Sequence, residues 1–326
     1  MVIKRLFIRQ TVFILLALLL LLVSGCTGGN NGNERKDSAA SYEIVDSTGT
    51  ILKMPQRPER IVSLSVSTDE ILIRLVPTQR IAALTYRADD GGISNITEQA
   101  KAVSARVRAN AEGIIALRPD LVIIPAWQPV ELIQLLRGAG IPVYVYKAAA
   151  TIDEVKQSIA SIAQAVGEEQ AGQQLVNDMD NELAQIAERV RQVPLDERKV
   201  VINYTLIGVV DGIGSTFDDI CRYAGVVNGA ASAGLKMSEL LTKEEIVTVN
   251  PDLILLPTWD YGSNTDIKAF GLSIQTDPAL QSVTAIRQRN LISVPDSHLA
   301  CSSQYIVQGV RDVAKAAYPQ YFNDGQ

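Results

Sequence analysis

The feature that most constrains the fold of this chain is an internal repeat of sixteen residues. Residues 112–127 (EGIIALRPDLVIIPAW) align with residues 244–259 (EEIVTVNPDLILLPTW), with seven identical positions at an offset of 132 residues. Each copy predicts a short helix, a Pro-Asp break, a buried parallel strand and a Pro-X-Trp exit at the strand's carboxyl end. The offset is too long for a solenoid repeat. We therefore expect two matching lobes that face a common cleft.

Short apolar runs alternate with helix-period segments through most of the chain, which is typical of parallel α/β layers. The expected elements of the first lobe are a hairpin at 42–45 and 51–54, strands at 61–64, 81–84, 121–124 and 143–146, and helices at about 68–76, 111–117 and 130–137. Those of the second lobe are strands at 200–204, 253–256 and 291–294 and a closing helix at about 304–317. The pattern predicts an α/β protein with two Rossmann-like lobes, each built on a parallel sheet.

The middle of the chain has a different pattern. Residues 151–193 contain helix formers that are interrupted by Gly167 and stopped by Pro194, with no strand signal. Apolar residues at 175, 179, 183, 186 and 190 fall on one helix face. As a helix, residues 168–192 would span about 37 Å. We therefore expect an N-terminal lobe at 41–150, a helical segment with a single long connecting helix at 151–193, and a C-terminal lobe at 194–326.

The first 25 residues are predicted to be removed from the mature protein. They contain Lys4, Arg5 and Arg9, no acidic residue, and an apolar run at 12–23 that suits a secretory signal and is short for a membrane span. The segment VSGC, ending at Cys26, resembles the lipobox of bacterial lipoproteins. We expect Cys26 to be lipidated, residues 26–40 to form a flexible tether, and the protein to be exported and anchored to the cell membrane. The alternative is an ordinary signal peptide with a Cys at this position by chance.

The charge of the chain excludes some partners. The sequence has 30 Lys+Arg against 36 Asp+Glu, and without the three cations of the leader the net charge falls from −6 to −9. This acidity argues against nucleic acid or an anionic lipid surface as the main partner. Besides Cys26 the chain has Cys221 and Cys301, which are either a disulfide or two free thiols in an oxidising compartment.

Trp127 and Trp259, the two tryptophans of the sequence, end the two copies of the repeat. Because ligands of open α/β sheets bind outside the carboxyl ends of the strands, these indoles are candidates to stack on a ligand from opposite walls of the cleft. The alternative is that each indole covers the core beneath it. Tyr86, Phe217 and Tyr261 are weaker candidates for the same cleft.

Catalytic patterns are scarce in this sequence. It has no Gly-x-Ser-x-Gly elbow, no phosphate-binding P-loop and no HExxH segment. Its single histidine, His298, is either a structural or solvated residue or an axial ligand to a chelated metal. We therefore expect a protein that is not an enzyme and carries no cofactor of its own, with a membrane-anchored hydrolase as the remote alternative.

Four segments, taken in order, resemble the class III substrate-binding lipoproteins of ABC importers, which include cobalamin-, ferric siderophore- and haem-binding proteins. These segments are RIVSLSVSTDEIL at 60–72, the repeat copy that begins at Glu112, GSTF with YAGVVN at 214–228, and the stretch from VPDSHL to YP at 294–319. The resemblance runs from about residue 42 to residue 321.

The resemblance implies that the protein captures a metal chelate and delivers it to a membrane dimer with a cytoplasmic ATPase. It also implies that Glu112 and Glu244 dock onto arginines of the two membrane subunits. Taken alone, each is an acid in the first turn of a helix, where the helix dipole favours it. The cargo is expected to be a cobalt or iron complex.

Two tryptophans and few nearby cations favour a corrinoid, with Arg87 and Arg222 as the only nearby cation candidates. A ferric siderophore is the alternative cargo. Haem is a further option, with His298 as a possible ligand.

Overall fold

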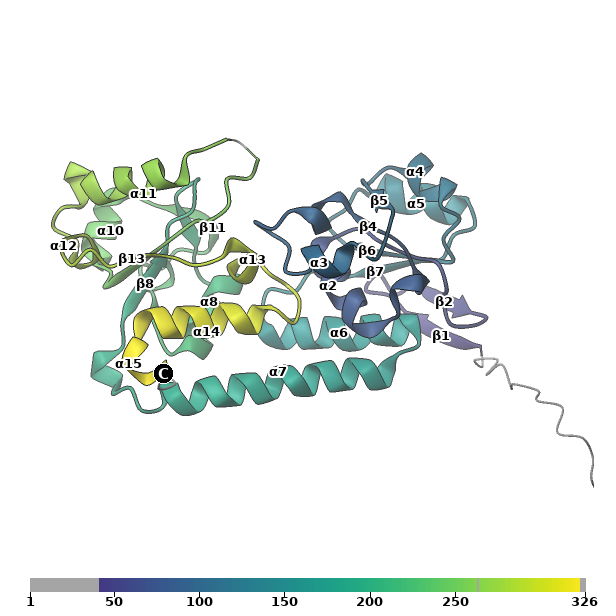
Figure 1. The fold of residues 1–326 in the computed structure, drawn as a ribbon, viewed down its shortest axis with the longest axis horizontal. Coiled ribbons are helices and arrows are strands. Elements are labelled where there is room, and N and C mark those ends of the chain that lie inside the picture. The colour runs from purple at the N-terminus through teal and green to yellow at the C-terminus, as the bar shows by residue number, and fades with distance from the viewer. Residues whose placement is uncertain (1–40, 263, 323–326) are drawn as a thin grey trace, which may run out of the picture. The chain divides into compact units, whose positions relative to one another are not determined.

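The computed structural model describes residues 41–262 and 264–322, and from Ser41 onward the chain forms one compact unit. Two α/β lobes, each with a parallel sheet, are joined by the long helix α7 (Glu169–Val190), as Figure 1 shows. The expected fold class is therefore confirmed. The leader, Cys26 and the expected tether lie outside the described residues. No helix among residues 41–262 and 264–322 is long and apolar enough to cross a membrane.

The first lobe is built on a five-stranded parallel sheet in the order β5-β4-β3-β6-β7. Its strands are β3 (Ile61–Ser63), β4 (Ile81–Thr85), β5 (Arg106–Val107), β6 (Leu121–Pro125) and β7 (Val143–Tyr146). Its helices are α2 (Val66–Leu75), α3 (Thr97–Ala100), α4 (Ala111–Ala116) and α5 (Val130–Gly138), with short 3-10 turns η1 (Thr78–Arg80) and η2 (Tyr86–Asp89). An antiparallel hairpin of β1 (Tyr42–Val45) and β2 (Ile51–Met54) precedes the sheet.

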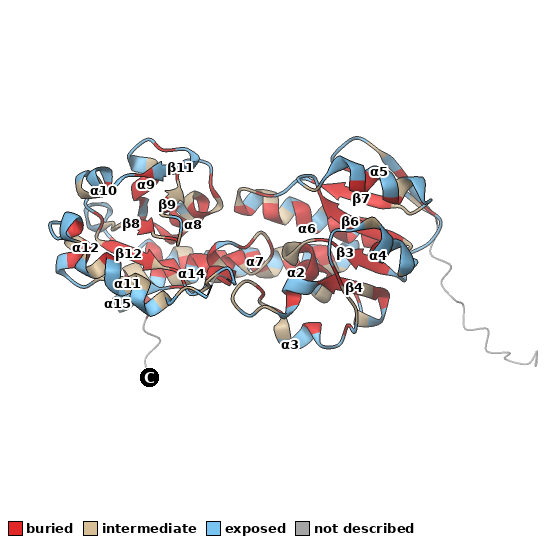
Figure 2. Ribbon diagram, turned by 90° about the horizontal axis from the view of Figure 1, so that it is seen from above, coloured by how far each residue is buried: buried red, intermediate tan, exposed pale blue. Residues whose placement is uncertain are grey.

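Burial in this sheet follows from the layers around it. Every residue of β3, β6 and β7 is buried, because helices cover both faces of the sheet. On β6, for example, Val122 and Ile124 pack in the cluster that holds Leu136 of α5. Ile123 points to the opposite face, into the cluster with Ile71 of α2. Figure 2 shows this burial along the strands.

The second lobe is built on a four-stranded parallel sheet in the order β10-β8-β12-β13. Its strands are β8 (Val200–Asn203), β10 (Val227–Asn228), β12 (Leu253–Leu256) and β13 (Leu291–Ser293), with an antiparallel ribbon of β9 (Val209–Asp211) and β11 (Met237–Leu241) beside them. Its helices are α8 (Thr216–Ala224), α9 (Gly229–Ser232), α10 (Lys243–Val249), α11 (Ile267–Thr276), α12 (Thr284–Arg287), α13 (Asp296–Leu299), α14 (Ile306–Ala317) and α15 (Pro319–Phe322), with 3-10 turns η3 (Leu195–Glu197) and η4 (Pro278–Leu280).

Helix α7 connects the lobes after α6 (Ile152–Val166). Gly167 ends α6 in the left-handed conformation, with φ of 72°, which glycine adopts without steric cost. Helix α7 contacts α2 of the first lobe and α8, α14 and α15 of the second. Its buried face carries the five apolar residues that the sequence pattern predicts, at 175, 179, 183, 186 and 190.

The two copies of the repeat fold into equivalent modules, α4 with β6 and α10 with β12. Arg118 and Asn250, which occupy matching positions, both have positive φ, of 49° and 50°. The aspartate of each Pro-Asp pair holds the start of a neighbouring strand. Asp120 accepts hydrogen bonds from the backbone N–H groups of Glu59 and Arg60, and Asp252 accepts one from that of Val200. The repeat therefore encodes both the helix end and the register of the adjacent strand.

Candidate functional site

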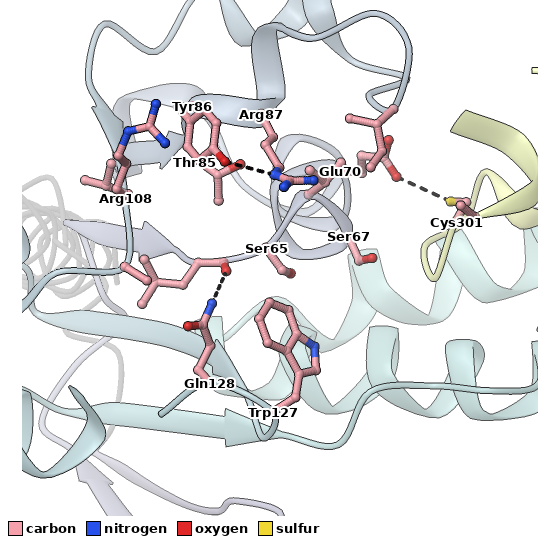
Figure 3. Close-up of a pocket in the computed structure, with 16 residues that line it drawn as sticks. Ser65, Ser67, Glu70, Thr85, Tyr86, Arg87, Arg108, Trp127, Gln128 and Cys301 are labelled. Carbon is pink, nitrogen blue, oxygen red and sulfur yellow. Dashed lines mark hydrogen bonds between the residues drawn. The ribbon is translucent and has the colours of Figure 1, made fainter. Parts of the chain in front are cut away.

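A cavity of about 530 Å³ lies where four parallel strands of the first lobe end (Figure 3). The segments that follow β3, β4, β5 and β6 form its walls, and two residues of the second lobe complete it. This is where open α/β sheets bind ligands, because the loops that leave the strand ends diverge there. Its lining residues are Leu64, Ser65, Val66, Ser67, Glu70, Thr85, Tyr86, Arg87, Ile93, Val107, Arg108, Ala109, Trp127, Gln128, Ala300 and Cys301.

Trp127 presents its indole to this cavity from the end of β6. The side chain is 65% exposed, which is unusual for so large an apolar group. Its backbone is held on both sides, since Ala126 N donates to Tyr146 O at 2.8 Å and Gln128 N donates to Pro125 O at 3.1 Å. A fixed and exposed indole is suited to stack on a flat or bulky ligand.

Two cations flank a tyrosine on the opposite wall of the cavity (Figure 3). The Arg108 guanidinium lies 3.7 Å from the centre of the Tyr86 ring, and Arg87 Nε donates to the Tyr86 hydroxyl at 3.1 Å. That hydrogen bond is the main reason why the pKa of Tyr86 is lowered. All three side chains are exposed. This wall suits anionic groups, because guanidinium groups recognise carboxylate and other oxyanions with paired N–H donors.

Two neighbouring acids of α2, Asp69 and Glu70, are buried behind this wall. Asp69 accepts hydrogen bonds from the backbone N–H and the hydroxyl of Thr85, and burial raises its pKa to about 7. Glu70 accepts hydrogen bonds from the backbone and side-chain N–H groups of Asn95, at 2.8 and 2.9 Å. Burial also raises the pKa of Glu70. Both acids therefore fix backbone segments that border the cavity.

The second lobe reaches the cavity through Ala300 and Cys301. The Cys301 thiol lies 3.5 Å from Glu70 Oε2, and Ser303 Oγ donates to the same oxygen at 2.5 Å. Burial raises the pKa of both Cys221 and Cys301, and both are free thiols. The disulfide alternative is therefore wrong, and both thiols are buried.

Trp259 does not line this cavity. Its indole Nε1 donates to Asp90 Oδ2 at 3.1 Å, across from the second lobe to the first. The Tyr261 ring lies beside it, with ring centres 4.4 Å apart, and the Arg87 guanidinium lies 6.0 Å from the indole centre. Trp259 and Tyr261 therefore border the strand-exit segment of the first lobe, and neither is among the residues that line the cavity.

Three other residues that the sequence suggests as candidates lie elsewhere in the fold. Phe217 is 3% exposed and belongs to the core beneath α8, so its prediction as a cleft residue is wrong. His298 packs beside α14, where its Nδ1 bonds Asp312 Oδ2 at 2.6 Å, and it does not line the cavity. Arg222 pairs with Asp219 on α8 at 2.6 Å and is likewise outside the cavity.

Arg108 is a cavity residue that sequence reasoning missed. It follows β5, which has only two residues and therefore no alternating or continuous apolar pattern to mark it. The sequence signal near this position is a pair of arginines, Arg106 and Arg108, separated by one residue. This spacing does not show which of the two arginines faces the cavity. Arg106 pairs with Asp89 at 2.7 Å, whereas Arg108 stacks on Tyr86.

Glu112 and Glu244 lie in the first turn of the helices of the two repeat modules and are both exposed. Among residues 41–262 and 264–322, neither carboxylate has a hydrogen bond or an ion pair. Glu245 differs, because it closes a capping box with Thr242 and accepts its backbone N–H at 2.8 Å. Glu244 is therefore the free acid of this pair, in the position that matches Glu112.

Within the described part of the chain, no three His, Cys, Asp or Glu side chains converge on a point that could hold a bare metal ion. The cavity is lined by serine, glutamine and arginine side chains and by the indole of Trp127, which offer hydrogen bonds, charge and stacking to a ligand.

The fold and the cavity define a two-lobed ligand-binding protein. The model of the family described as periplasmic binding protein matches residues 61–297, so the chain belongs to this family. The expected membership is confirmed, and the chain is a substrate-binding protein of an ABC transporter. The family and the relatives found are binding proteins.

Three comparisons illustrate these similarities. The chain is 25% identical to the uncharacterized ABC transporter substrate-binding lipoprotein YvrC of Bacillus subtilis, over 97% of this chain and 99% of that protein. It is 26% identical to a cobalamin-binding protein of Halobacterium salinarum, over 86% of this chain and 75% of the relative. Among solved structures, the periplasmic heme-binding protein RhuT of Roseiflexus sp. RS-1 matches with a TM-score of 0.68 and 25% identity, over 81% of this chain and 99% of that chain.

Proposed function

We propose that this protein captures a metal chelate in the cavity beside Trp127 and delivers it to the membrane subunits of an ABC importer. The observation that carries this proposal is a cavity of about 530 Å³ with an exposed indole at the strand ends. Its volume falls in the range of about 300–1,000 Å³ that is usual for small-molecule sites. Delivery to the membrane subunits is proposed because the chain belongs to the periplasmic binding protein family.

The charges on the cavity wall favour an anionic iron chelate as cargo. The preference for a corrinoid depends on two facing indoles and few cations. Of the two tryptophans, however, Trp127 lines the cavity and Trp259 does not, and two arginines, Arg87 and Arg108, line it as well. Carboxylate or catecholate groups at the edge of an iron complex would pair with these guanidinium groups while Trp127 covers its face. A corrinoid stays as the alternative, because a cobalamin-binding protein is among the relatives.

A titration of the purified protein tests the cargo. Haemin, ferric citrate, a ferric catecholate siderophore and cyanocobalamin would be added separately, and tryptophan fluorescence and visible absorption recorded. We expect saturable quenching with one of the anionic iron complexes. If cyanocobalamin alone saturates the protein, the cargo is a corrinoid and not an iron complex. If no probe saturates it, the chelate proposal is contradicted. Ester and glycoside substrates serve as the control for the hydrolase alternative, since turnover of either would contradict a purely binding role.

Glu112 and Glu244 are proposed to meet the two membrane subunits of the importer, whose ATPase lies in the cytoplasm. Their support is that matching positions of two equivalent modules carry exposed acids with free carboxylates. Paired acids suit a partner with two similar subunits, and charges at the rim of an interface set encounter rate and orientation.

Lipidation of Cys26 is proposed to hold the exported protein at the membrane. Its support is the sequence at 23–26 and the apolar leader before it. The test compares cells that express the native chain with cells that express Cys26→Ser, after growth with a radiolabelled fatty acid. We expect label and membrane attachment in the native protein only. Equal release of both proteins into the medium would instead identify an ordinary cleaved signal peptide.

A further inference from the structure

The segment of residues 85–95, which we name the strap, leaves the end of β4 and borders the cavity. Tyr86, Arg87 and Ile93 of the strap are cavity-lining residues. Its two ends are held by the buried acids of α2. Asp69 accepts hydrogen bonds from Thr85, and Glu70 accepts them from Asn95. Between these ends, Asp89 is also held by the first lobe, because Arg106 donates to its two carboxylate oxygens at 2.8 and 2.7 Å, whereas Asp90 and Gly92 contact Trp259 of the second lobe.

Trp259 covers the middle of the strap. Its Nε1 donates to Asp90 Oδ2 at 3.1 Å, while Asp90 Oδ1 accepts the backbone N–H of Gly92 at 2.9 Å. The indole lies so close to Gly92 that a Cβ atom built there would be 2.0 Å from Trp259 Cδ1. The contact therefore requires a residue without a side chain at position 92. Gly91 has no such neighbour, since a Cβ there would meet only Thr97 Cγ2, at 3.9 Å.

The second lobe fixes the backbone of Trp259 through Asp296. Asp296, at the start of α13 and 7% exposed, accepts hydrogen bonds from the backbone N–H groups of Thr258 and Trp259, at 2.6 and 2.8 Å. The indole therefore extends from a fixed point at the end of β12. A further bond joins the lobes near the end of the strap, because Asn95 Nδ2 donates to the Ser297 carbonyl at 2.8 Å.

We infer that Trp259 is a positioning residue for ligand binding: through Asp90 and Gly92 it holds the strap, and with it the cavity-facing side chains of Tyr86 and Arg87. The second lobe thus acts on the ligand through the strap, in addition to its direct contribution from Ala300 and Cys301. This inference deepens the proposed function, because it takes Tyr86 and Arg87 as ligand contacts. The positioning itself is a property of the ligand-free protein and is tested there.

The first experiment measures amide hydrogen exchange of peptides that cover the strap, in the ligand-free protein. Gly92→Ala is compared with Gly91→Ala, a matched control that adds the same methyl group one residue away. Neither glycine has a left-handed φ, so backbone strain does not separate the two variants. We expect strap amides to exchange roughly 2- to 30-fold faster in Gly92→Ala, the usual range for coupling between parts of one protein. Equal exchange in the two variants would overturn the inference.

The second experiment separates the Trp259 contact from a general loss of stability. Asp90→Ala removes the acceptor of the indole N–H, whereas Asp90→Asn keeps one oxygen, which can accept from Trp259 Nε1 or from Gly92 N but not from both, and is therefore a partial rescue. In a Trp127→Phe background Trp259 is the only tryptophan, so its quenching by acrylamide reports its exposure. We expect stronger quenching and faster strap exchange in Asp90→Ala, values between those of Asp90→Ala and the native protein in Asp90→Asn, and similar melting temperatures in both variants. Unchanged quenching in Asp90→Ala would contradict the contact.

The third experiment connects the strap to binding, with whichever of haemin, ferric citrate, the catecholate complex or cyanocobalamin saturates the native protein. Gly92→Ala is expected to release that probe roughly 2- to 30-fold faster than Gly91→Ala. Altered strap exchange with equal probe release would overturn the positioning role. If no probe saturates the native protein, the proposed cargo fails while the exchange data still decide whether Trp259 holds the strap.

Discussion

The two copies of the repeat place their glutamates alike and their tryptophans differently. Glu112 and Glu244 are both exposed at the start of a short helix. Trp127 is 65% exposed on the cavity wall, whereas Trp259 is half-buried against the strap. Equivalent backbone modules thus carry side chains with different roles, because the role depends on what the rest of the fold brings to the strand exit.

The chain that follows each tryptophan explains the difference. After Trp127, Gln128 N bonds Pro125 O and Pro129 leads directly into α5, so nothing covers the indole. After Trp259 the chain continues through a loop in which Tyr261 takes a positive φ of 55° and packs its ring against the indole at a tilt of 44°. The strap of the first lobe covers another side of Trp259. The same motif therefore yields an open platform in one lobe and an inter-lobe contact in the other.

The largest expected effect tests the similarity of the two glutamates. Reversal of both, as Glu112→Lys with Glu244→Lys, is expected to abolish uptake of the cargo while its affinity for the purified protein is retained. One lysine would then face the arginines of each membrane subunit, and this like-charge contact lowers the encounter rate and disfavours the docked orientation. Uptake by cells and binding in solution are measured on the same variants.

The control for this experiment is Glu245→Lys, which changes the neighbouring acid that closes the capping box. It is expected to lower stability slightly, because half of the capping box is lost while Thr242 still caps the helix, and to retain transport. Equal loss of transport in this control would show that Glu244 has no specific role. Native uptake by the double variant would contradict the docking proposal.

The second effect concerns the acid that anchors the strap in the first lobe. The folded-state pKa of Asp69 is about 7, above its usual 3.8, so the folded protein binds more protons than the unfolded chain between these values. Asp69 therefore destabilises the fold increasingly as pH rises from about 4 to about 7. At about 1.4 kcal/mol per unit, the effect is of the order of a few kcal/mol.

Asp69→Asn removes this titration and keeps an oxygen that accepts the Thr85 N–H. The free energy of unfolding, measured in denaturant from pH 4 to 8, is expected to rise for the variant relative to the native protein as pH increases. The difference between the two proteins cancels the other titrating groups. Parallel stability curves for variant and native protein would show that Asp69 titrates as an ordinary carboxyl.

The third effect compares the two tryptophans. Trp127→Ala is expected to weaken binding of the cargo by roughly 10- to 100-fold, the value of burying a large apolar side chain against a ligand. Its effect on stability is expected to be small, because the indole is already exposed. Trp259→Ala is expected to weaken binding less, because it acts through the strap. Titration by visible absorption measures both variants, and a larger loss in Trp259→Ala would reverse the assigned roles.

The smallest effect tests the charge of the cargo. Arg87→Gln and Arg108→Gln are each expected to weaken binding of an anionic chelate by about 1 kcal/mol, and the loss is expected to shrink as salt is added. Arg222→Gln is the matched control, because this arginine lies outside the cavity and pairs with Asp219. Equal affinity of all three variants at low salt would favour the corrinoid over an anionic iron complex.

Much of the architecture could be predicted from local pattern. The strand at 143–146 and the hairpin at 42–54 have the predicted bounds, because continuous apolar runs and a Gly-containing turn mark them. Shorter elements escaped prediction. Strand β5 has two residues, β9 has three, and β11 is exposed at every position but its last, so none of them has a hydrophobic period to detect.

The candidate site was only partly predictable. Trp127 and Tyr86 were identified because they follow strands, and strand ends gather at one edge of a parallel sheet, whereas Arg87 was named only as a nearby cation. Arg108 and Cys301 were not, since their place in the cavity depends on how distant segments pack. Phe217 shows the opposite error, because an aromatic residue beside a glycine-rich loop can equally well turn into the core.

The sequence by itself determined the repeated modules, the parallel sheets, the helix that joins them and the two exposed glutamates, because each follows from short-range periodicity or from a motif. Only the tertiary structure decided which tryptophan faces a ligand. That choice depends on contacts between residues such as Asp90 and Trp259, 169 positions apart. Local pattern fixes where a side chain leaves the backbone, whereas its burial depends on neighbours that only the packed lobes provide.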